Sequence, residues 1–242
     1  MSVEDPEAAL SELLAVYAQP QPWEHRHPLV ALRAAALLRD IPAKTYRPSG
    51  SRDGQTISSR LRRSHFGITT VLHQAVTLLE LPEPPATYGL GPHFASQRKH
   101  ARKALRAGVT WTLVTEAAQR DHLLELVDAR ERVRVQADFS PEEVTGLLDN
   151  DLWLAAWQGE RPLLLAVAAV DGEWSMLRYF CRLESSRVAG STRYLMTGVL
   201  AEELAARGAR FACDFVSPFR LPPGLRKFSR MVGFRTHRVQ MK

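Results

Sequence analysis

Three apolar, strand-like segments joined by short turns constrain the fold of this chain more than any other feature of its sequence. The segments cover residues 152–157, 163–170 and 174–181. Gln158-Gly159-Glu160-Arg161 and Asp171-Gly172 connect them, and glycine-containing connections this short are typical of β-hairpins. The sequence therefore predicts three consecutive antiparallel strands.

Helix and strand patterns flank these hairpins on both sides. Before them the patterns predict a strand over 109–114, an amphipathic helix over 116–132 and a short helix opened by the capping box Ser140-Pro141-Glu142-Glu143. After them the patterns predict a helix over 192–207, a strand over 211–216, a helix over 225–232 and a strand over 235–241. This order predicts an α/β (α+β) fold in which helices flank a mixed, mainly antiparallel sheet.

The beginning of the chain is predicted to be mostly helical. Asp5-Pro6-Glu7 provides an N-cap followed by proline, and a second helix follows Pro28, whereas residues 67–81 are compatible with a helix or a strand. A linker follows, marked by Pro82, Pro84, Pro85, Gly89, Gly91 and Pro92. We therefore expect an N-terminal region of unknown role over 1–92 and a second domain over 93–242.

Composition and charge narrow the class of protein. The 242 residues are 45% hydrophobic, which suffices for a core, and their net charge of +6 favours an anionic partner such as nucleic acid, a membrane surface or a phosphorylated cofactor. No apolar run is long enough to span a bilayer and the start lacks a signal-peptide pattern, so we expect a cytoplasmic protein without a membrane span. The two cysteines, Cys181 and Cys213, and the histidines lack the spacing of metal ligands, so we predict no metal site. Formation of a homo-oligomer stays open.

A helix that Ser96 can cap and that ends at Gly108 is predicted to carry a basic face. Its cations are Arg98, Lys99, Arg102, Lys103 and Arg106. Their spacing places the arginines in one row and the lysines in the next, and each close pair of like charges costs roughly a few tenths of a kcal/mol. Two interpretations stay open: a solvated face, or a contact surface for RNA or an anionic sugar polymer.

From about residue 107 onwards, the order of elements resembles the GNAT N-acyltransferases. Phe228-Ser229-Arg230-Met231-Val232-Gly233-Phe234 resembles the family's Phe-Tyr-x-x-x-Gly-Phe ending of the last helix, with Ser229 in place of the tyrosine. Arg187-Val188-Ala189-Gly190-Ser191-Thr192 resembles the family's Arg/Gln-x-x-Gly-x-Gly/Ala phosphate loop. The resemblance implies a GNAT-like sheet and transfer of an acyl group from acetyl-CoA or another acyl-CoA to a substrate amine.

A second resemblance involves the basic helix. The segments 98–109 and 224–228 are similar to the Fem-type peptidoglycan transferases and related GNAT-like proteins. Members of that group can take their acyl group from aminoacyl-tRNA, and the basic face would then hold the acceptor stem. A third alternative is a GNAT-like domain without catalysis that binds nucleic acid or protein; Ser229 in place of the tyrosine favours both alternatives.

The residues around the start of the 192–207 helix form the predicted cofactor site. A glycine-containing loop that enters a helix presents free N–H groups and the positive end of the helix dipole, which suit a pyrophosphate. The expected cofactor-binding residues are Arg187, Gly190, Ser191, Thr192 and Arg193. The alternative is an ordinary strand-to-helix turn capped by Ser191.

The resemblance also implies the place of the chemistry. In GNAT proteins the donor lies where an antiparallel strand and the next parallel strand splay apart, which here means segments 174–181 and 211–216. Asp214 is expected to point to the face of its strand opposite its aromatic neighbours. It is predicted to be either the general base or the partner of an arginine, and Glu173 and Glu184 are weaker candidates for the base. Because the hydroxyl of Ser229, at the position of the family's tyrosine, is a much weaker proton donor, protonation of the leaving group would fall to Tyr179, to Tyr194, to solvent or to nothing.

Overall fold

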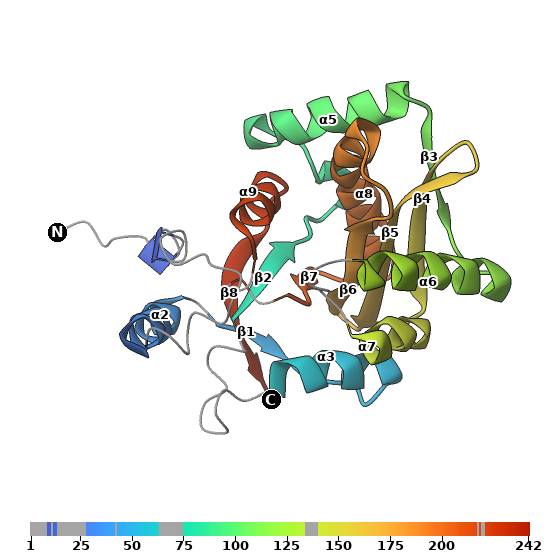
Figure 1. Cartoon of the computed structure of the whole chain (residues 1–242). Coiled ribbons are helices and arrows are strands. Elements are labelled where there is room, and N and C mark those ends of the chain that lie inside the picture. The colour runs from blue at the N-terminus through green and yellow to red at the C-terminus, as the bar shows by residue number, and fades with distance from the viewer. Residues whose placement is uncertain are drawn as a thin grey trace.

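The computed structural model describes residues 9–10, 12–13, 28–41, 43–62, 75–133, 140–216, 218 and 221–242, and their strands form one eight-stranded sheet (Figure 1). The strand order is β1-β8-β2-β7-β6-β5-β4-β3. The strands are β1 (Ala43–Tyr46), β2 (Ala75–Glu80), β3 (Val109–Leu113), β4 (Leu152–Gln158), β5 (Arg161–Asp171), β6 (Trp174–Arg182), β7 (Phe211–Asp214) and β8 (Arg235–Met241).

One half of the sheet is antiparallel and the other half is mixed. β3, β4, β5 and β6 are antiparallel neighbours, which confirms the predicted hairpins. Gly159 and Gly172 in the two turns have φ values of 60° and 59°, a left-handed conformation that favours glycine. β7 runs parallel to β6, β2 is antiparallel to β7 and β8, and β1 is parallel to β8. The predicted GNAT-like class of mixed sheet is confirmed.

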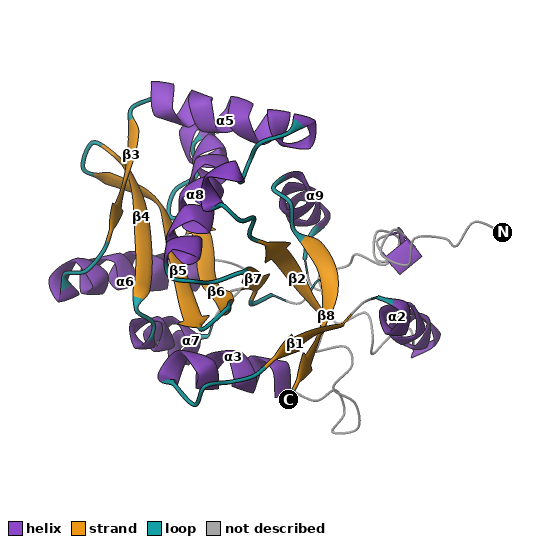
Figure 2. Cartoon of the chain, turned by 180° about the vertical axis from the view of Figure 1, so that it is seen from behind, coloured by secondary structure: helices purple, strands orange, loops and turns teal. Residues whose placement is uncertain are grey.

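Helices cover both faces of this sheet (Figure 2). One face carries α5 (Ala95–Arg106), α8 (Arg187–Ala206) and α9 (Pro223–Met231), and the other carries α3 (Arg52–Arg62), α6 (Ala117–Arg132) and α7 (Pro141–Thr145). α2 (Pro28–Asp40) packs through Ala34 and Leu38 against Ala75 at the start of β2. Short 3-10 turns lie at Pro85–Thr87, Pro92–Phe94 and Gly146–Asp149.

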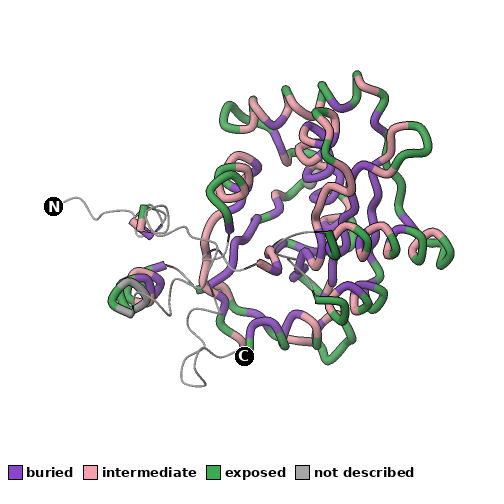
Figure 3. Tube along the Cα trace, viewed as in Figure 1, coloured by how far each residue is buried: buried purple, intermediate pink, exposed green. Residues whose placement is uncertain are grey.

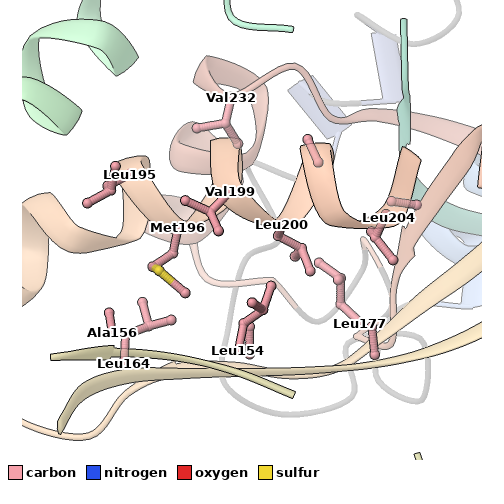
Figure 4. Packing of buried hydrophobic residues seen from close by; sticks show 14 of the residues in the cluster. Leu154, Ala156, Leu164, Leu177, Leu195, Met196, Val199, Leu200, Leu204 and Val232 are labelled. Atoms are coloured by element: carbon pink, nitrogen blue, oxygen red, sulfur yellow. The ribbon is translucent and has the colours of Figure 1, made fainter. Parts of the chain in front are cut away.

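Two apolar cores lie between the sheet and these helix layers. α8 inserts Leu195, Met196, Val199, Leu200 and Leu204 over Leu154, Ala156 and Leu164 of the sheet (Figure 4). Each large side chain buried in this way contributes about 2 kcal/mol. Buried residues gather along the strands and on parts of the helices, and exposed residues on the outer turns (Figure 3). The core therefore fixes α8, and with it the residues on its inner face, over β5 and β6.

The sheet crosses the domain boundary expected at residue 92. β1 and β2 lie before it and hydrogen-bond with β8 and β7, which lie after it. These pairings join segments that are far apart in the sequence, so no local sequence pattern predicts them. Of the ambiguous run 67–81, residues 75–80 form β2 and 67–74 lie outside the described residues, as does most of the predicted helix after Asp5. The region is helical in α2 and α3 and also supplies strands to the main sheet.

A buried carboxylate fastens the segment before α3 to the end of β5. Asp171 is 6% exposed and accepts hydrogen bonds from the Tyr46 hydroxyl (2.7 Å), the Ser49 N–H (3.1 Å), the Ser51 hydroxyl (3.0 Å) and the Ser49 hydroxyl. Burial by itself raises the pKa of Asp171, but the bonds from Ser49, Tyr46 and Ser51 outweigh it and hold the pKa below its ordinary value. A Cβ added to Gly54 would lie 2.8 Å from the carboxylate, so only glycine permits this approach.

The helix starts test the capping predictions. At Ser140 the capping box is confirmed, with the Glu143 N–H donating to the Ser140 hydroxyl (3.2 Å) and the Ser140 N–H donating to the Glu143 carboxylate (3.0 Å). At α5 the predicted cap is wrong, because the N-cap residue is Phe94 and Ser96 lies inside the first turn.

Candidate active site

A small cleft opens where β6 and β7 separate. The two strands pair from Trp174 with Phe211 to Leu177 with Asp214, and the Phe215 N–H still donates to the Leu177 carbonyl oxygen at 3.1 Å. β6 then continues to Arg182 without β7 beside it. The cleft encloses about 80 Å³. Its apolar walls include Phe180, Leu200, Leu221, Leu225, Phe228 and Phe234. This is the place where the resemblance to GNAT proteins puts the donor group.

Asp214 lies in this cleft at the last position of β7. Its neighbours Cys213 and Phe215 belong to the core on the α3 and α6 side, so strand alternation directs Asp214 to the α8 side, as predicted. Burial raises the pKa of Asp214 to about 6, although the Val216 N–H (2.9 Å) and the charge of Arg193 favour the carboxylate. Among the described residues no cation lies within ion-pair distance of it. A carboxylate with these properties can exchange a proton near neutral pH.

Arg193 of α8 faces Asp214 across the same cleft. Its guanidinium lies 4.6 Å from the ring centroid of Phe228 and 6.0 Å from that of Phe180. Burial lowers the pKa of Arg193, and the charge of Asp214 opposes that shift. Its Nε atom is buried and has no hydrogen-bond acceptor among the described residues. The cleft thus holds the carboxylate of Asp214 and the guanidinium of Arg193, close enough to influence each other but not joined in an ion pair, and Arg178 also lines it.

Two further arginines brace the end of β7. Arg60 of α3 is 5% exposed, and its Nε donates to the Phe215 carbonyl oxygen at 2.7 Å. Arg178 is the extra residue of a β-bulge in β6, and its guanidinium lies 4.5 Å from the centroid of the Phe215 ring. Both contacts hold the residue that follows Asp214. The region before residue 92 therefore supports the cleft through α3.

Sequence reasoning overlooked Arg178 and gave Arg193 a different place. Arg178 interrupts the apolar run Met176-Leu177-Arg178-Tyr179-Phe180. A single charged residue within a strand predicted to be buried was the signal that could have identified it as a site residue. Arg193 precedes the buried Thr197 and Leu200 by four and seven residues, the spacing of one helix face. That spacing within the predicted 192–207 helix was the available signal for an inward guanidinium.

The structure separates the other two predicted catalytic residues. Ser229 of α9 is 8% exposed and lines the cleft. Tyr179 also borders it from β6, but its hydroxyl is held by α6, where the Arg130 Nη1 donates to it at 3.0 Å and Glu131 lies 3.4 Å away. Burial raises the pKa of Tyr179 well above its ordinary value. Its hydroxyl is therefore turned from Asp214 and is a poor acid.

The predicted phosphate loop is helical. α8 begins at Arg187, five residues before its predicted start, and its N-cap is Ser186, whose hydroxyl accepts from the Ala189 N–H at 3.0 Å. The Gly190 N–H is already bonded to the Ser186 carbonyl oxygen (3.2 Å), and Ser191 and Thr192 are buried. The loop over 187–192 and the cap at Ser191 are thus wrong, because the helix dipole ends at Ser186 rather than at Gly190. A role for these residues in cofactor binding stays a prediction.

The basic face of α5 is divided between structure and solvent. Arg98 Nη1 donates to the carbonyl oxygens of Gly89 (2.5 Å) and Gly91 (2.7 Å), so this arginine holds the preceding linker. The other four cations, Lys99, Arg102, Lys103 and Arg106, are exposed. Their opposite face packs on α8, where His100 stacks on Tyr194 at 4.5 Å. The exposed four form what we call the α5 cationic face.

Within the described ranges, no group of three or more His, Cys, Asp or Glu side chains is placed to hold a metal ion. The helices that the structure describes include none with the length and apolar character needed to cross a membrane.

Comparison with known proteins gives the fold. No protein-family model and no curated protein matches the sequence. Among solved structures, FemX superposes with a TM-score of 0.50 at 9% identity, over 68% of this chain and 60% of that one. A conserved protein of unknown function from Bacteroides thetaiotaomicron gives 0.52 at 10% identity, over 67% and 57%. The C-terminal domain of a putative lysylphosphatidylglycerol synthetase from Agrobacterium fabrum gives 0.47 at 16% identity, over 67% and 58%. The chain therefore has a GNAT-like fold of the kind seen in FemX, and spans about three fifths of the length of these structures.

Proposed function

We propose that this chain is an acyltransferase that moves an aminoacyl group from tRNA to an amine in the cleft between β6 and β7. The observation that carries the proposal is Asp214, a carboxylate with a pKa of about 6 at the point where the strands diverge. The amine nitrogen attacks the ester carbonyl carbon and forms the C–N bond, while the C–O bond to the tRNA ribose breaks. Asp214 accepts the proton that the amine loses, and the departing ribose oxygen takes up a proton.

The choice of donor rests on charge and on the start of α8. The four exposed cations of the α5 cationic face suit the phosphates of a polynucleotide, which such side chains bind with release of counterions. Gly190 lies inside α8, so the segment before this helix is not the glycine-containing loop that would suit a pyrophosphate. The shared fold with FemX and the resemblance to Fem-type transferases agree with a tRNA donor.

Acyl-CoA is the second candidate donor, supported by a different observation. α8 is a helix of 20 residues whose N-terminus, at Ser186 and the exposed Arg187, follows a short connection from the end of β6 at Arg182. Its dipole and free N–H groups suit an anion. The third candidate is a binding module without catalysis, which is favoured by Ser229 at the tyrosine position and by the engaged hydroxyl of Tyr179.

Parallel transfer assays test these candidates. The protein is incubated with amine acceptors and either a set of aminoacyl-tRNAs charged with radiolabelled amino acids or acetyl-CoA and longer acyl-CoAs. We expect amide product from aminoacyl-tRNA. Product from acyl-CoA alone would select the second candidate, and tRNA binding without any product would select the third.

A charge variant tests the α5 cationic face in the same assays. Glutamine at Lys99, Arg102, Lys103 and Arg106, with Arg98 kept, should weaken tRNA binding and reduce the slope of log affinity against log salt by roughly 0.7 to 0.9 per lost phosphate contact. Glutamine at the exposed Arg33, Arg39 and Arg207 is the control and should leave the slope nearly unchanged. Equal slopes in both variants would remove the α5 cationic face from the proposal.

A further inference from the structure

The cleft contains a carboxylate and a guanidinium of opposite charge, and neither has an ion-pair partner among the described residues. Asp214 accepts one hydrogen bond, from the Val216 N–H, and belongs to no ion pair among the described residues. The guanidinium of Arg193 lies against the rings of Phe228 and Phe180, and its buried Nε has no hydrogen-bond acceptor among the described residues. Asp214 and Arg193 are both half-buried, and charges withdrawn from water without a partner are costly, so a site that keeps both is suited to a ligand that completes them.

The size of the cleft limits that ligand. A volume of about 80 Å³ has room for roughly five to eight water-sized groups. An ammonium, an α-carbon, a carboxylate and a small side chain occupy about that space. The apolar walls formed by Leu200, Leu225 and Phe234 suit the carbon atoms of such a group, and Thr197 and Ser229 are further polar residues that line the cleft.

We propose that the cleft binds the head group of a free α-amino acid, with its carboxylate on Arg193 and its amine at Asp214. Bidentate bonding by a guanidinium matches the geometry of a carboxylate. The aminoacyl group of a tRNA donor has its carboxyl group esterified and cannot form this contact. Resting on the proposed function, the assignment makes the amino acid the acceptor: its amine loses a proton to Asp214 and attacks the donor carbonyl.

Binding of three matched small molecules tests this assignment without turnover. Alanine has both groups, alaninamide lacks the carboxylate and propionate lacks the amine. By calorimetry or ligand-observed NMR on the full chain, alanine should bind about tenfold or more tightly than either analogue. Arg193→Gln should abolish the preference for alanine over alaninamide, and Asp214→Asn should abolish the preference over propionate. Arg207→Gln, an exposed change of the same charge immediately after α8, should alter neither preference.

The outcomes separate this inference from the proposed function. Equal binding of the three compounds, no binding of alanine, or an unchanged preference in a folded Arg193→Gln variant would overturn the amino-acid site. Arg193→Lys, which keeps the charge, should retain part of the preference if Arg193→Gln fails to fold. Selective alanine binding without transfer from any donor would reject the proposed function alone. Transfer to simple amines as efficient as transfer to alanine would reject the inference alone.

Discussion

Replacement of Asp214 by asparagine should stabilise the protein at neutral pH. Asparagine has nearly the same shape, and its carbonyl oxygen can still accept from the Val216 N–H. The pKa of Asp214 is about 6 in the folded protein and about 3.9 in an unfolded chain. That pKa difference of about two units means that ionisation of Asp214 destabilises the folded state relative to the unfolded state by about 3 kcal/mol. Any cost of placing the asparagine amide group reduces the gain expected from the substitution.

The sign follows from proton linkage. A carboxyl group whose pKa is raised on folding binds its proton more tightly in the folded state, so its contribution to stability is fully present below about pH 4 and is lost as the pH rises through about 6. The asparagine variant does not titrate at this position. It should therefore match the wild type near pH 4 and exceed it by about 1 to 3 kcal/mol at pH 7.5.

Urea unfolding at both pH values measures this difference. The midpoint of thermal unfolding should rise by about 2 to 4 °C for each kcal/mol, and Asp121→Asn, an exposed change on α6, is the control. Destabilisation by about 3 kcal/mol or more at pH 7.5 would refute the reasoning, because that loss is expected when one partner of a buried ion pair is removed.

Three other changes follow from the described contacts. Asp171→Ala should lower the free energy of unfolding by about 3 kcal/mol or more, measured in urea, because it removes the acceptor of four hydrogen bonds; an unchanged midpoint would contradict this. Gly190→Ala should raise it by about 0.5 to 1 kcal/mol, since Gly190 is helical with open space around it, whereas a loss would return the residue to a loop. Iodoacetamide at pH 8 should modify Cys181, which lines the cleft, but not the buried Cys213, whose pKa burial raises to about 12; mass spectrometry that finds Cys213 modified first would contradict this.

Local patterns predicted the elements whose causes are local. The β4 to β6 hairpins follow from continuous apolar runs of strand length and from turns at Gly159 and Gly172, and α7 follows from its capping box. The position of Asp214 followed from the period of a strand once the fold was suspected. These features depend on residues within a few positions of one another.

Long-range contacts account for what the sequence could not predict. The pairing of β2 with β7 and β8 joins residues more than 130 positions apart, so the linker at 82–92 suggested a boundary that the sheet crosses. α8 begins early because Ser186 caps it and the sheet packs on its first turns, which outweighs the low helix propensity of Gly190. Arg193 was predicted to bind phosphate, a role that stays a prediction, and the structure places its guanidinium in the cleft with Asp214.

The pH dependence of aminoacyl transfer tests the central claim most directly. With aminoacyl-tRNA as donor and saturating acceptor, kcat of the wild type should fall below an inflection near pH 6, where Asp214 takes up its proton. Asp214→Asn should reduce kcat by about 100-fold or more at pH 7, with the loss easing at high pH as the amine deprotonates unaided. A fully active, folded asparagine variant with the same pH profile as the wild type would contradict the assignment of Asp214 as the base.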